Sequence, residues 1–276
     1  AMVDSGYEPI NSMGSDIPLA VLSKQAQPIY NYFKQEFAQV TNPPIDPLRE
    51  KFFMALQCYL GSAGNILKIE GNNARQIFLH GPVLTPDNFA KIVGAEVHGY
   101  KISTLDALFD VDDTTSLQKS IKQINEAAEK SVTSGASILI LDNSLISSTQ
   151  VSIPSLLIVG AIHHHLCQVG LRRKTSIIIK GVDVIEAHHV ACLLSFGADA
   201  VYPSLAMESI EDTFAKGEKT NTKVLNNYIK AMDSGLLKIM SKLGISTVNS
   251  YKAAQTFEAL GIHKEVMDVC FKGAVS

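Results

Sequence analysis

The run Ser137-Ile138-Leu139-Ile140-Leu141 decides the fold class, because it is short and continuously apolar. Such a run is typical of a strand that helices cover on both faces of a parallel sheet. Two more runs of this kind follow, Ser176-Ile177-Ile178-Ile179 and Ala198–Tyr202, after segments of helical length at 154–169 and 184–194. Strands that alternate with helices indicate right-handed βαβ units. We therefore expect an α/β fold whose parallel βαβ units resemble an incomplete β/α barrel.

On both sides of these units the sequence predicts a more irregular, mainly helical structure. Apolar residues at helical spacing predict two early helices, one through Ile29, Tyr30, Phe33 and Phe37 and one through Leu48, Phe52, Leu56 and Tyr59, which Gly61 ends. Further strands are expected at 76–79 and 101–104, and further helices from Thr85 and at 117–132, 208–214, 224–243 and 250–260. Residues 3–15 are polar and are expected to fray.

The composition is that of an ordinary folded protein. The 276 residues suffice for one large α/β domain or two small ones, and 46% of them are hydrophobic. A net charge of −3 gives no electrostatic reason to expect nucleic acid or an anionic membrane as a partner. No apolar run reaches the about 18 residues of a membrane-spanning helix, and no secretory pattern is recognised. The cysteines, Cys58, Cys167, Cys192 and Cys270, lack metal or redox spacing and are expected to be buried and reduced in a cytoplasmic protein.

Between the two early helices lies the stretch Val40-Thr41-Asn42-Pro43-Pro44-Ile45-Asp46-Pro47-Leu48-Arg49-Glu50. Each proline fixes its own φ, lacks an amide donor and pushes the residue before it toward extended geometry. We expect a stiff, extended connector, after which Asp46 caps a helix that begins at Pro47. Such a connector would hold Thr41 and Asn42 in a fixed place.

This stretch resembles a hallmark of the glutamate synthase family, in the central domain of the large (alpha) subunit. Three further blocks resemble the same domain in the same order. They are DIPLAVLS (Asp16 to Ser23), IPSLLIVGAIHHHL (Ile153 to Leu166) with GADAVYPSLAMESI (Gly197 to Ile210), and NYIKAMDSGLLKIMSKLGIS (Asn227 to Ser246) with SYKAAQTFEALGI. The resemblance implies that residues 16–262 are the central domain. It also implies that 263–276 begin a linker toward the FMN-binding domain. Residues 1–15 are interpreted from their own sequence as an expression remnant, Ala1-Met2, followed by a flexible tail.

The resemblance implies a connecting role between two active sites. The central domain is expected to be non-catalytic, to join the glutaminase site to the flavin (synthase) site, and to contribute to ammonia channelling in glutamate biosynthesis from glutamine and 2-oxoglutarate. Its expected partners are the glutaminase and FMN-binding domains of the same parent chain. No cofactor is expected in this domain, whereas the parent, an amide-transferring oxidoreductase, is expected to use FMN and an iron–sulfur cluster. Thr41 and Asn42 match the family's segment near the tunnel entrance and are assigned as tunnel or interdomain residues.

Neither of the parent's active sites is expected within this chain. The family's glutaminase chemistry resembles that of an N-terminal cysteine whose α-amine is the base, whereas the first cysteine here, Cys58, lies inside a predicted helix. An iron–sulfur cluster requires grouped cysteines, and the four present are far apart in the sequence. Nucleophile and cluster chemistry are therefore expected to lie outside these residues.

Two groups of adjacent histidines invite a metal hypothesis. They are His163-His164-His165 and His188-His189. Consecutive helical residues point about 100° apart, so neighbours cannot converge on one ion, and shared ligation needs i, i+4 spacing. One histidine from each group would still reach an ion together with Asp142 or Asp183 across the sheet. We expect instead that these histidines are buried or interdomain hydrogen-bonding groups.

An alternative function would place a site at the carboxyl ends of the strands, where parallel α/β folds bind ligands. Asp142, Lys180 and Tyr202 follow or end the three apolar runs and would serve a free-standing β/α-type enzyme, with Lys180 as a base or anion clamp. However, no glycine-rich loop follows these strands, and Pro203 lacks a donor. The resembling family often carries Ser-Asp-Arg where this chain has Leu141-Asp142-Asn143, which weakens any transfer of a role. A separate scaffold protein with the same fold is the other alternative.

Overall fold

The computed structural model describes residues 2–8, 18–36, 51–65, 67–68, 75–113, 115–214 and 218–276. The proline-rich stretch at 40–50, with Thr41 and Asn42, lies outside these residues. What was expected of the connector therefore stays a prediction.

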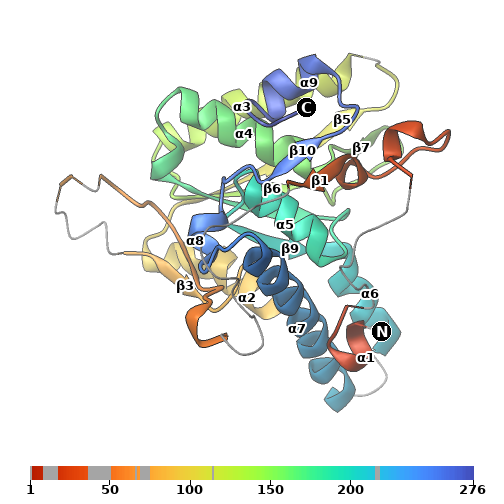
Figure 1. Cartoon of the computed structure of the whole chain (residues 1–276). Helices are drawn as coiled ribbons and strands as arrows, with labels where there is room; N and C mark the ends of the chain where they lie inside the picture. The colour runs from red at the N-terminus through yellow and green to blue at the C-terminus, as the bar shows by residue number, and fades with distance from the viewer. Residues whose placement is uncertain are drawn as a thin grey trace.

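A four-stranded parallel sheet forms the centre of the molecule (Figure 1). Its strands, in their order across the sheet, are β4 (Ile102–Asp106), β6 (Ile138–Asp142), β8 (Ser176–Gly181) and β9 (Ala200–Pro203). Each strand pairs in parallel with its neighbour in the sheet. All residues of β6 and β9 are buried, because helices cover both faces of the sheet. The predicted α/β fold and its parallel βαβ units are thus confirmed.

Helices lie between these strands along the chain or follow the last of them, and they form a layer on each side of the sheet. Their bounds are α2 Pro86–Val93, α3 Ser116–Thr133, α4 Ser155–Gln168, α5 Ala187–Ser195, α6 Ser204–Phe214, α7 Glu218–Lys242 and α9 Lys264–Cys270. In Figure 1, α3, α4 and α9 gather at the top and α2, α6 and α7 at the bottom, with the sheet between them. The α4 helix packs on α3, α5 and α9, so its residues Leu156 to Ile162 are buried almost all round. That burial matches its nearly continuous apolar sequence.

A short segment extends the sheet beyond β9. The amide of Leu84 donates to Val201 O and the amide of Val201 donates to Pro82 O, both at 2.8 Å, and Val83 bridges Val201 in parallel. This segment precedes α2 and β4 in the chain, yet it pairs with the last strand of the sheet. The order of the strands in the sheet is that of a β/α barrel. Among the described residues, however, this segment and β4 lie at opposite edges, so the sheet is open and does not close into a barrel.

Smaller elements surround this sheet. The strands are β1 Phe33–Gln35, β2 Cys58–Leu60, β3 Ile77–Leu79, β5 Leu108–Asp110, β7 Gln150–Ser152 and β10 Phe257–Ala259, and the short helices are α1 Met2–Ser5, η1 Ala20–Leu22, η2 Ile29–Tyr32, η3 Lys51–Phe53, η5 Gly94–His98, η6 Arg172–Lys174 and α8 Val248–Tyr251. The strands form three antiparallel pairs, β1 with β10, β2 with β3 and β5 with β7. The predicted strands at 76–79 and 101–104 correspond to β3 and β4. The helix predicted from Thr85 is α2, and Thr85 Oγ1 caps it by accepting from Asn88 N at 3.2 Å.

The helix predicted through residues 29–37 is wrong. A single 3₁₀ turn, η2, leads instead into strand β1, which pairs antiparallel with β10. Phe33 meets Phe196 and Phe271 edge-on, with ring centroids 5.3 and 4.8 Å away. This aromatic cluster and the β10 ladder together outweigh the helical spacing, which is a weak preference.

The helix predicted through Phe52, Leu56 and Tyr59 is wrong as well. Phe52 is 90% exposed, and strand β2 follows, with Cys58 and Leu60 buried and Tyr59 exposed between them. Burial therefore alternates with a period of two, as in a strand, but the neighbouring apolar residues obscure this period in the sequence. The pairing of β2 with β3 decides which side chains are buried.

The helix predicted at 250–260 ends after one turn, at α8. Ala253 and Gln255 take φ values of 57° and 52°, in the left-handed region that stops a helix. Their amides donate to Leu194 O and Ser195 O at 2.9 and 3.0 Å. Those carbonyls lie at the end of α5, so tertiary hydrogen bonds stabilise the break, and β10 follows it.

Both ends of the described chain pack on the body. Residues 2–5 form α1 and lie against α7, although fraying was expected for 3–15, of which residues 9–15 are not described. At the other end, α9 packs on α4 and leads Phe271 into the core. The boundary at residue 262 stays a prediction. Within the described part of the chain, no helix is both long enough and apolar enough to cross a membrane.

Candidate functional site

Four polar side chains share one level at the carboxyl ends of the parallel strands. Asp106, Asp142, Lys180 and Tyr202 are paired in register across β4, β6, β8 and β9. Side chains at one register level lie on the same face of a sheet. The structure therefore brings together Asp142, Lys180 and Tyr202, the three residues of the alternative site, and adds Asp106.

Asp142 and Lys180 form an ion pair at this level. Lys180 Nζ lies 2.9 Å from Asp142 Oδ2, and the two side chains are 22% and 10% exposed, respectively. The other carboxylate oxygen, Oδ1, accepts from Ser144 N at 2.9 Å and Ser144 Oγ at 2.6 Å. Burial alone would raise the pKa of Asp142, but the hydrogen bonds from Ser144 and Lys180 lower it overall. Both carboxylate oxygens are thus occupied by groups of the chain itself.

Asn143 fixes the loops that follow β6 and β8. It is fully buried, and its Nδ2 donates to Ile153 O at 3.0 Å and to Ser155 Oγ at 3.1 Å. Its Oδ1 accepts from Val182 N at 3.0 Å. Three of the four hydrogen bonds that a side-chain amide can make are thus made to neighbouring loops. Asn143 is therefore a structural residue of this edge.

Asp183 caps α4 from the next loop along the sheet. Its Oδ2 accepts from Ser155 N at 3.0 Å, and Ser155 Oγ donates to Oδ1. Pro154 occupies the cap position and has no side-chain acceptor, so Asp183 supplies the missing one. Ser155 is fully buried and has no access to a substrate.

Tyr202 lies under an aromatic cover. Its ring stacks on that of Phe89 from α2, with centroids 4.4 Å apart and planes 6° from parallel. Burial, followed by the negative charges of Glu211 and Glu208, raises the pKa of Tyr202. The phenol is therefore a poorer acid than a free tyrosine, and its ring closes one end of the polar row.

The three consecutive histidines on α4 bind three separate partners. His163 Nδ1 accepts from Arg172 Nε at 3.1 Å, His164 Nε2 lies 3.2 Å from Gln255 Nε2, and His165 Nε2 lies 2.8 Å from Glu129 Oε2. The rotation of about 100° per helical residue explains why they diverge. Burial, and then the charges of Arg172 and His164, lower the pKa of His163 to about 3.

The histidines of α5 are also hydrogen-bonded. His188 Nε2 lies 3.0 Å from Tyr30 O, and His189 Nδ1 accepts from Ile185 N at 3.2 Å. The His189 ring stacks on Tyr30, with centroids 4.1 Å apart. The hydrogen-bonding role predicted for both groups of histidines is confirmed. In the ranges that the structure describes, no group of three or more His, Cys, Asp or Glu residues is placed to hold a metal ion.

The cysteines are free, and three of the four are buried as predicted. Cys167 is exposed, contrary to the prediction, because it lies in the last turn of α4, where the helix projects past the core. Its Sγ lies 3.7 Å from His163 Nε2. Cys58 lies in strand β2, not in a helix, and burial, the largest effect, raises its pKa to about 12. A thiol with so high a pKa is a poor nucleophile.

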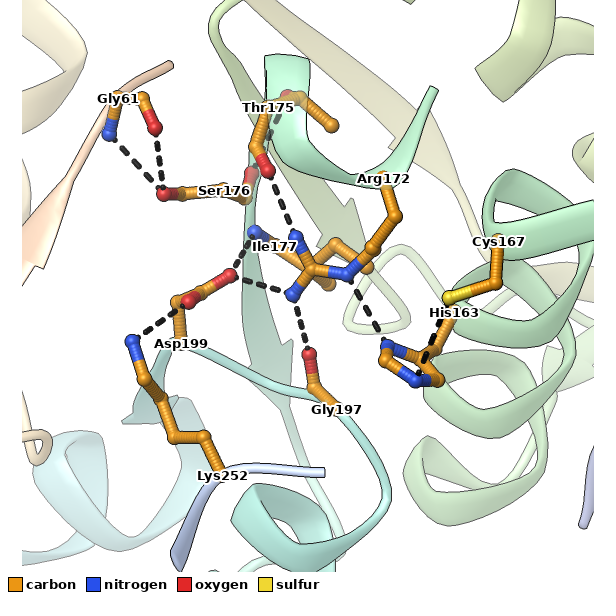
Figure 2. A network of polar contacts seen from close by, with 10 residues as sticks. All are labelled: Gly61, His163, Cys167, Arg172, Thr175, Ser176, Ile177, Gly197, Asp199 and Lys252. Atoms are coloured by element: carbon orange, nitrogen blue, oxygen red, sulfur yellow. Dashed lines mark hydrogen bonds and ion pairs between the residues drawn. The ribbon is translucent and has the colours of Figure 1, made fainter. Parts of the chain in front are cut away.

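A second polar network, which was not predicted from the sequence, lies at the opposite, amino-terminal edge of the sheet. Figure 2 shows Asp199 between Arg172 and Lys252. Its Oδ2 accepts from Arg172 Nη2 at 2.7 Å and Ile177 N at 2.8 Å, and its Oδ1 accepts from Lys252 Nζ at 2.8 Å. Arg172 also donates to Thr175 O at 2.7 Å. The only signal in the sequence is an aspartate placed directly before an apolar strand.

Burial alone would raise the pKa of Asp199, but the charges of Arg172 and Lys252 and the hydrogen bonds from Lys252 and Ile177 lower it to about 2. The network ties the loop before β9 to η6 and to the segment after α8. Nearby, Ser176 Oγ accepts from Gly61 N at 3.0 Å and donates to Gly61 O at 3.1 Å (Figure 2), which attaches the region after β2. In parallel α/β folds this edge contributes to stability, whereas ligands bind at the other edge.

Comparison with known proteins identifies relatives along the whole chain. A family model described as "Glutamate synthase central domain" matches residues 1–263. The large chain of NADPH glutamate synthase from Bacillus subtilis is 41% identical over 277 residues, covering 100% of this chain and 18% of its own. NADH glutamate synthase from Schizosaccharomyces pombe is 40% identical, with 100% and 13% covered. The ferredoxin-dependent chloroplastic enzyme of Spinacia oleracea is 40% identical, with 100% and 18% covered. This chain therefore spans less than a fifth of each of these relatives.

Solved structures give weaker similarities. The recombinant flavin-binding domain of baker's yeast flavocytochrome b2 is 16% identical, with a TM-score of 0.42, covering 71% of this chain and 42% of that one. A GMP reductase from Trypanosoma brucei in complex with guanosine 5'-triphosphate is 15% identical, with a TM-score of 0.39, covering 66% and 45%.

Proposed function

Because the chain belongs to the glutamate synthase central-domain family, we propose that it is the non-catalytic part of such an enzyme that connects the glutaminase and flavin (synthase) sites. In this role it contributes to the channelling of ammonia during glutamate biosynthesis from glutamine and 2-oxoglutarate. Its partners are then the glutaminase and FMN-binding domains of a longer chain in the cytoplasm. The parent uses FMN and an iron–sulfur cluster outside these residues.

The observation that carries this proposal is the extent of the matches. The family model covers residues 1–263, and the whole chain aligns with relatives that are named glutamate synthases and are several times longer. Because the chain spans only a small share of each relative's length, we infer a role inside a larger enzyme. This inference does not depend on any one site residue.

The carboxyl edge of the sheet supports a connecting role over a catalytic one. Asp142 is occupied by Lys180 and Ser144, and Asn143 is occupied by the loops around it. An active site keeps groups available for its substrate, whereas here the polar groups hold loops together. Pro203, at the end of β9, offers no amide donor to a phosphate. The polar groups at the carboxyl edge of the sheet thus stabilise the loops around them.

Thr41 and Asn42 are proposed to line the ammonia path at the glutaminase boundary. In the longer glutamate synthase chain that carries this domain, Thr41→Val or Asn42→Ala is expected to uncouple the two reactions, because the prolines that follow both residues in the sequence are expected to restrict the backbone there. Glutamine hydrolysis should then exceed glutamate formation from 2-oxoglutarate. The two rates are measured together under synthase conditions. Thr149→Val, at an exposed residue, is the matched control. A one-to-one ratio of glutamine hydrolysis to glutamate formation in both Thr41→Val and Asn42→Ala would contradict the assignment.

A second candidate function has one observation in its favour, the side-by-side placement of Asp142, Lys180 and Tyr202. A free-standing enzyme with an anion clamp at Lys180 would bind inorganic phosphate or FMN there. Calorimetric titration of the 276-residue chain with each probe distinguishes the two functions. We expect no binding and a colourless protein, as a connecting domain requires. Saturable binding that Lys180→Met abolishes would establish the second function instead.

A further inference from the structure

Residues 2–8 cross the surface of α7 and end at the start of α5. Asn227 Nδ2 donates to Val3 O at 2.9 Å and to Asp4 O at 3.0 Å. The Lys230 ammonium lies over the Tyr7 ring, 4.8 Å from its centroid, which is a cation–π contact. Figure 1 shows α1 beside α7. These contacts bring Glu8, the last described residue of the segment, to the amino end of α5.

Glu8 caps α5 from far away in the sequence. Its Oε1 accepts from Ala187 N, the first amide of the helix, at 3.0 Å. Glu186 occupies the cap position but makes no side-chain cap of its own. Amides in the first helical turn have no partner within the helix, and a carboxylate there is favoured by the helix dipole. Glu8 therefore supplies an acceptor that the local sequence lacks.

The α7 helix leaves room for this carboxylate. At Gly235, a Cβ atom would lie 2.4 Å from Ala187 Cβ and 3.1 Å from Glu8 Oε2. Only glycine permits α7, α5 and the Glu8 side chain to approach so closely. The seat for Glu8 is thus formed by three separate segments of the chain.

A second carboxylate lies at the same helix end. Burial raises the pKa of Glu186, the charge of Glu8 raises it further, and His188 lowers it. His189 Nε2 lies 3.5 Å from Glu186 Oε1, and on the α7 side Tyr228 OH donates to Ile185 O at 2.9 Å. The pKa of Tyr228 is raised too, by burial and then by Glu8 and Glu186.

The sign of the pH dependence follows from these neighbours. When the segment leaves, Glu186 loses the repulsion of Glu8 and binds its proton more weakly. The attached state therefore binds more protons, so attachment strengthens as the pH falls toward the raised pKa of Glu186 and weakens as the pH rises above it. His188, His189, Asp183 and Lys230 are the other charged or titratable groups that surround this helix end.

We propose that residues 2–8 form a strap that opens and closes over the amino end of α5, with Glu8 as its latch and Glu186 as the group that weakens it at higher pH. Closing the strap protects the Ala187 amide, and opening it exposes that amide to solvent. This inference goes beyond the connecting function and does not depend on it.

Hydrogen exchange of the Ala187 amide in the 276-residue chain tests the strap. Between about pH 5 and about pH 7.5, the opening equilibrium, corrected for the intrinsic exchange rate, should increase in the wild-type chain. Glu8→Ala should raise it about fivefold at low pH, as expected for the loss of one helix cap. Glu186→Gln should keep the amide protected and remove the pH dependence.

Two further variants test the seat of the latch and a site away from it. Gly235→Ala should open the strap although both carboxylates remain, since the new methyl group would overlap Ala187 Cβ and crowd Glu8 Oε2, which forces α7 and the Glu8 side chain away from α5. Glu126→Ala, on the exposed face of α3, should leave the Ala187 amide unchanged. Exchange at Ala187 that is the same in wild type, Glu8→Ala and Gly235→Ala would overturn the proposal. A wild-type opening equilibrium that is independent of pH would overturn the role of Glu186.

Discussion

Replacing Asp199 with alanine is expected to lower the free energy of unfolding by about 3–5 kcal/mol, the usual cost of removing one partner from a buried ion pair. The residue Asp199 is 7% exposed, and its carboxylate is bonded to Arg172, Lys252 and the amide of Ile177. Without it, the Lys252 ammonium and the Ile177 amide lose this acceptor inside the protein, and Arg172 keeps only its neutral acceptors, among them Thr175 O and His163 Nδ1. Urea denaturation at neutral pH measures the change. Asp199→Asn should recover part of it, because the amide oxygen still accepts one hydrogen bond.

An exposed ion pair provides the control for this prediction. Asp113 also has a pKa lowered to about 2, by hydrogen bonds from Lys119 and Thr115, yet it lies in open solvent. Exposed pairs are screened by water and contribute little to folding. Asp113→Asn should therefore leave the denaturation midpoint unchanged within error. Equal effects of Asp113→Asn and Asp199→Ala would mean that burial is not what makes the Asp199 network important.

The same network makes stability depend on pH in the acid range. The pKa of Asp199 is about 2 in the folded protein, below the value of an unfolded aspartate, so its stabilisation is complete above about pH 4 and is lost as the pH falls toward 2. The wild-type chain should lose about 2 kcal/mol more than Asp199→Asn over that window. Parallel acid-unfolding curves for the two proteins would contradict this.

Replacing Gly160 with alanine is expected to be the second most damaging change, because α4 and α9 touch at this residue. A Cβ atom there would lie 2.1 Å from Cys270 O and 3.1 Å from Cys270 C. Both are backbone atoms, so relief requires α9 to move away from α4, which would disturb the Phe271 ring in the core. We expect a loss of about 3 kcal/mol, at the upper end of the cost of overpacking. Thermal and urea denaturation measure it.

Gly94 is the matched control for Gly160. It follows α2, has an ordinary φ of −75°, and a Cβ atom there would meet nothing within 4 Å. Gly94→Ala should be neutral or slightly stabilising, since alanine restricts the unfolded chain. If Gly160→Ala were equally harmless, α9 would not be seated on α4 as the structure has it. Residues beyond 262 would then contribute little to stability.

The strands and helices of the second half of the fold could be predicted from the sequence because the patterns that indicate them are local and strong. Continuous apolar runs such as 137–141 have few alternatives to a buried strand, and the helices between them are of ordinary length. The strands of the first part could not be predicted in this way. Phe33 and Tyr59 fit a helical spacing equally well, and only distant partners, β10 and β3, decide that they lie in strands.

The polar residues divide in the same way, into positions that the sequence predicts and contacts that it does not predict. Sequence position placed Asp142, Lys180 and Tyr202 at the strand ends, and the structure brings them together. What they do there depends on Ser144 and Phe89, whose contacts no spacing predicts. Asp199 and its two cations come from three separate segments, so the network exists only once the chain has folded.

The ladder between β1 and β10 has a consequence for synthesis. Its strands are separated by about 220 residues of chain, so a ribosome that adds about 5–20 residues per second needs roughly 10–45 s to deliver β10 after β1 has emerged. During that interval the Phe33 side chain has neither its strand partner nor the Phe271 ring. A chain still being translated therefore presents an uncovered aromatic segment, of the kind that chaperones recognise, until β10 and Phe271 have been made.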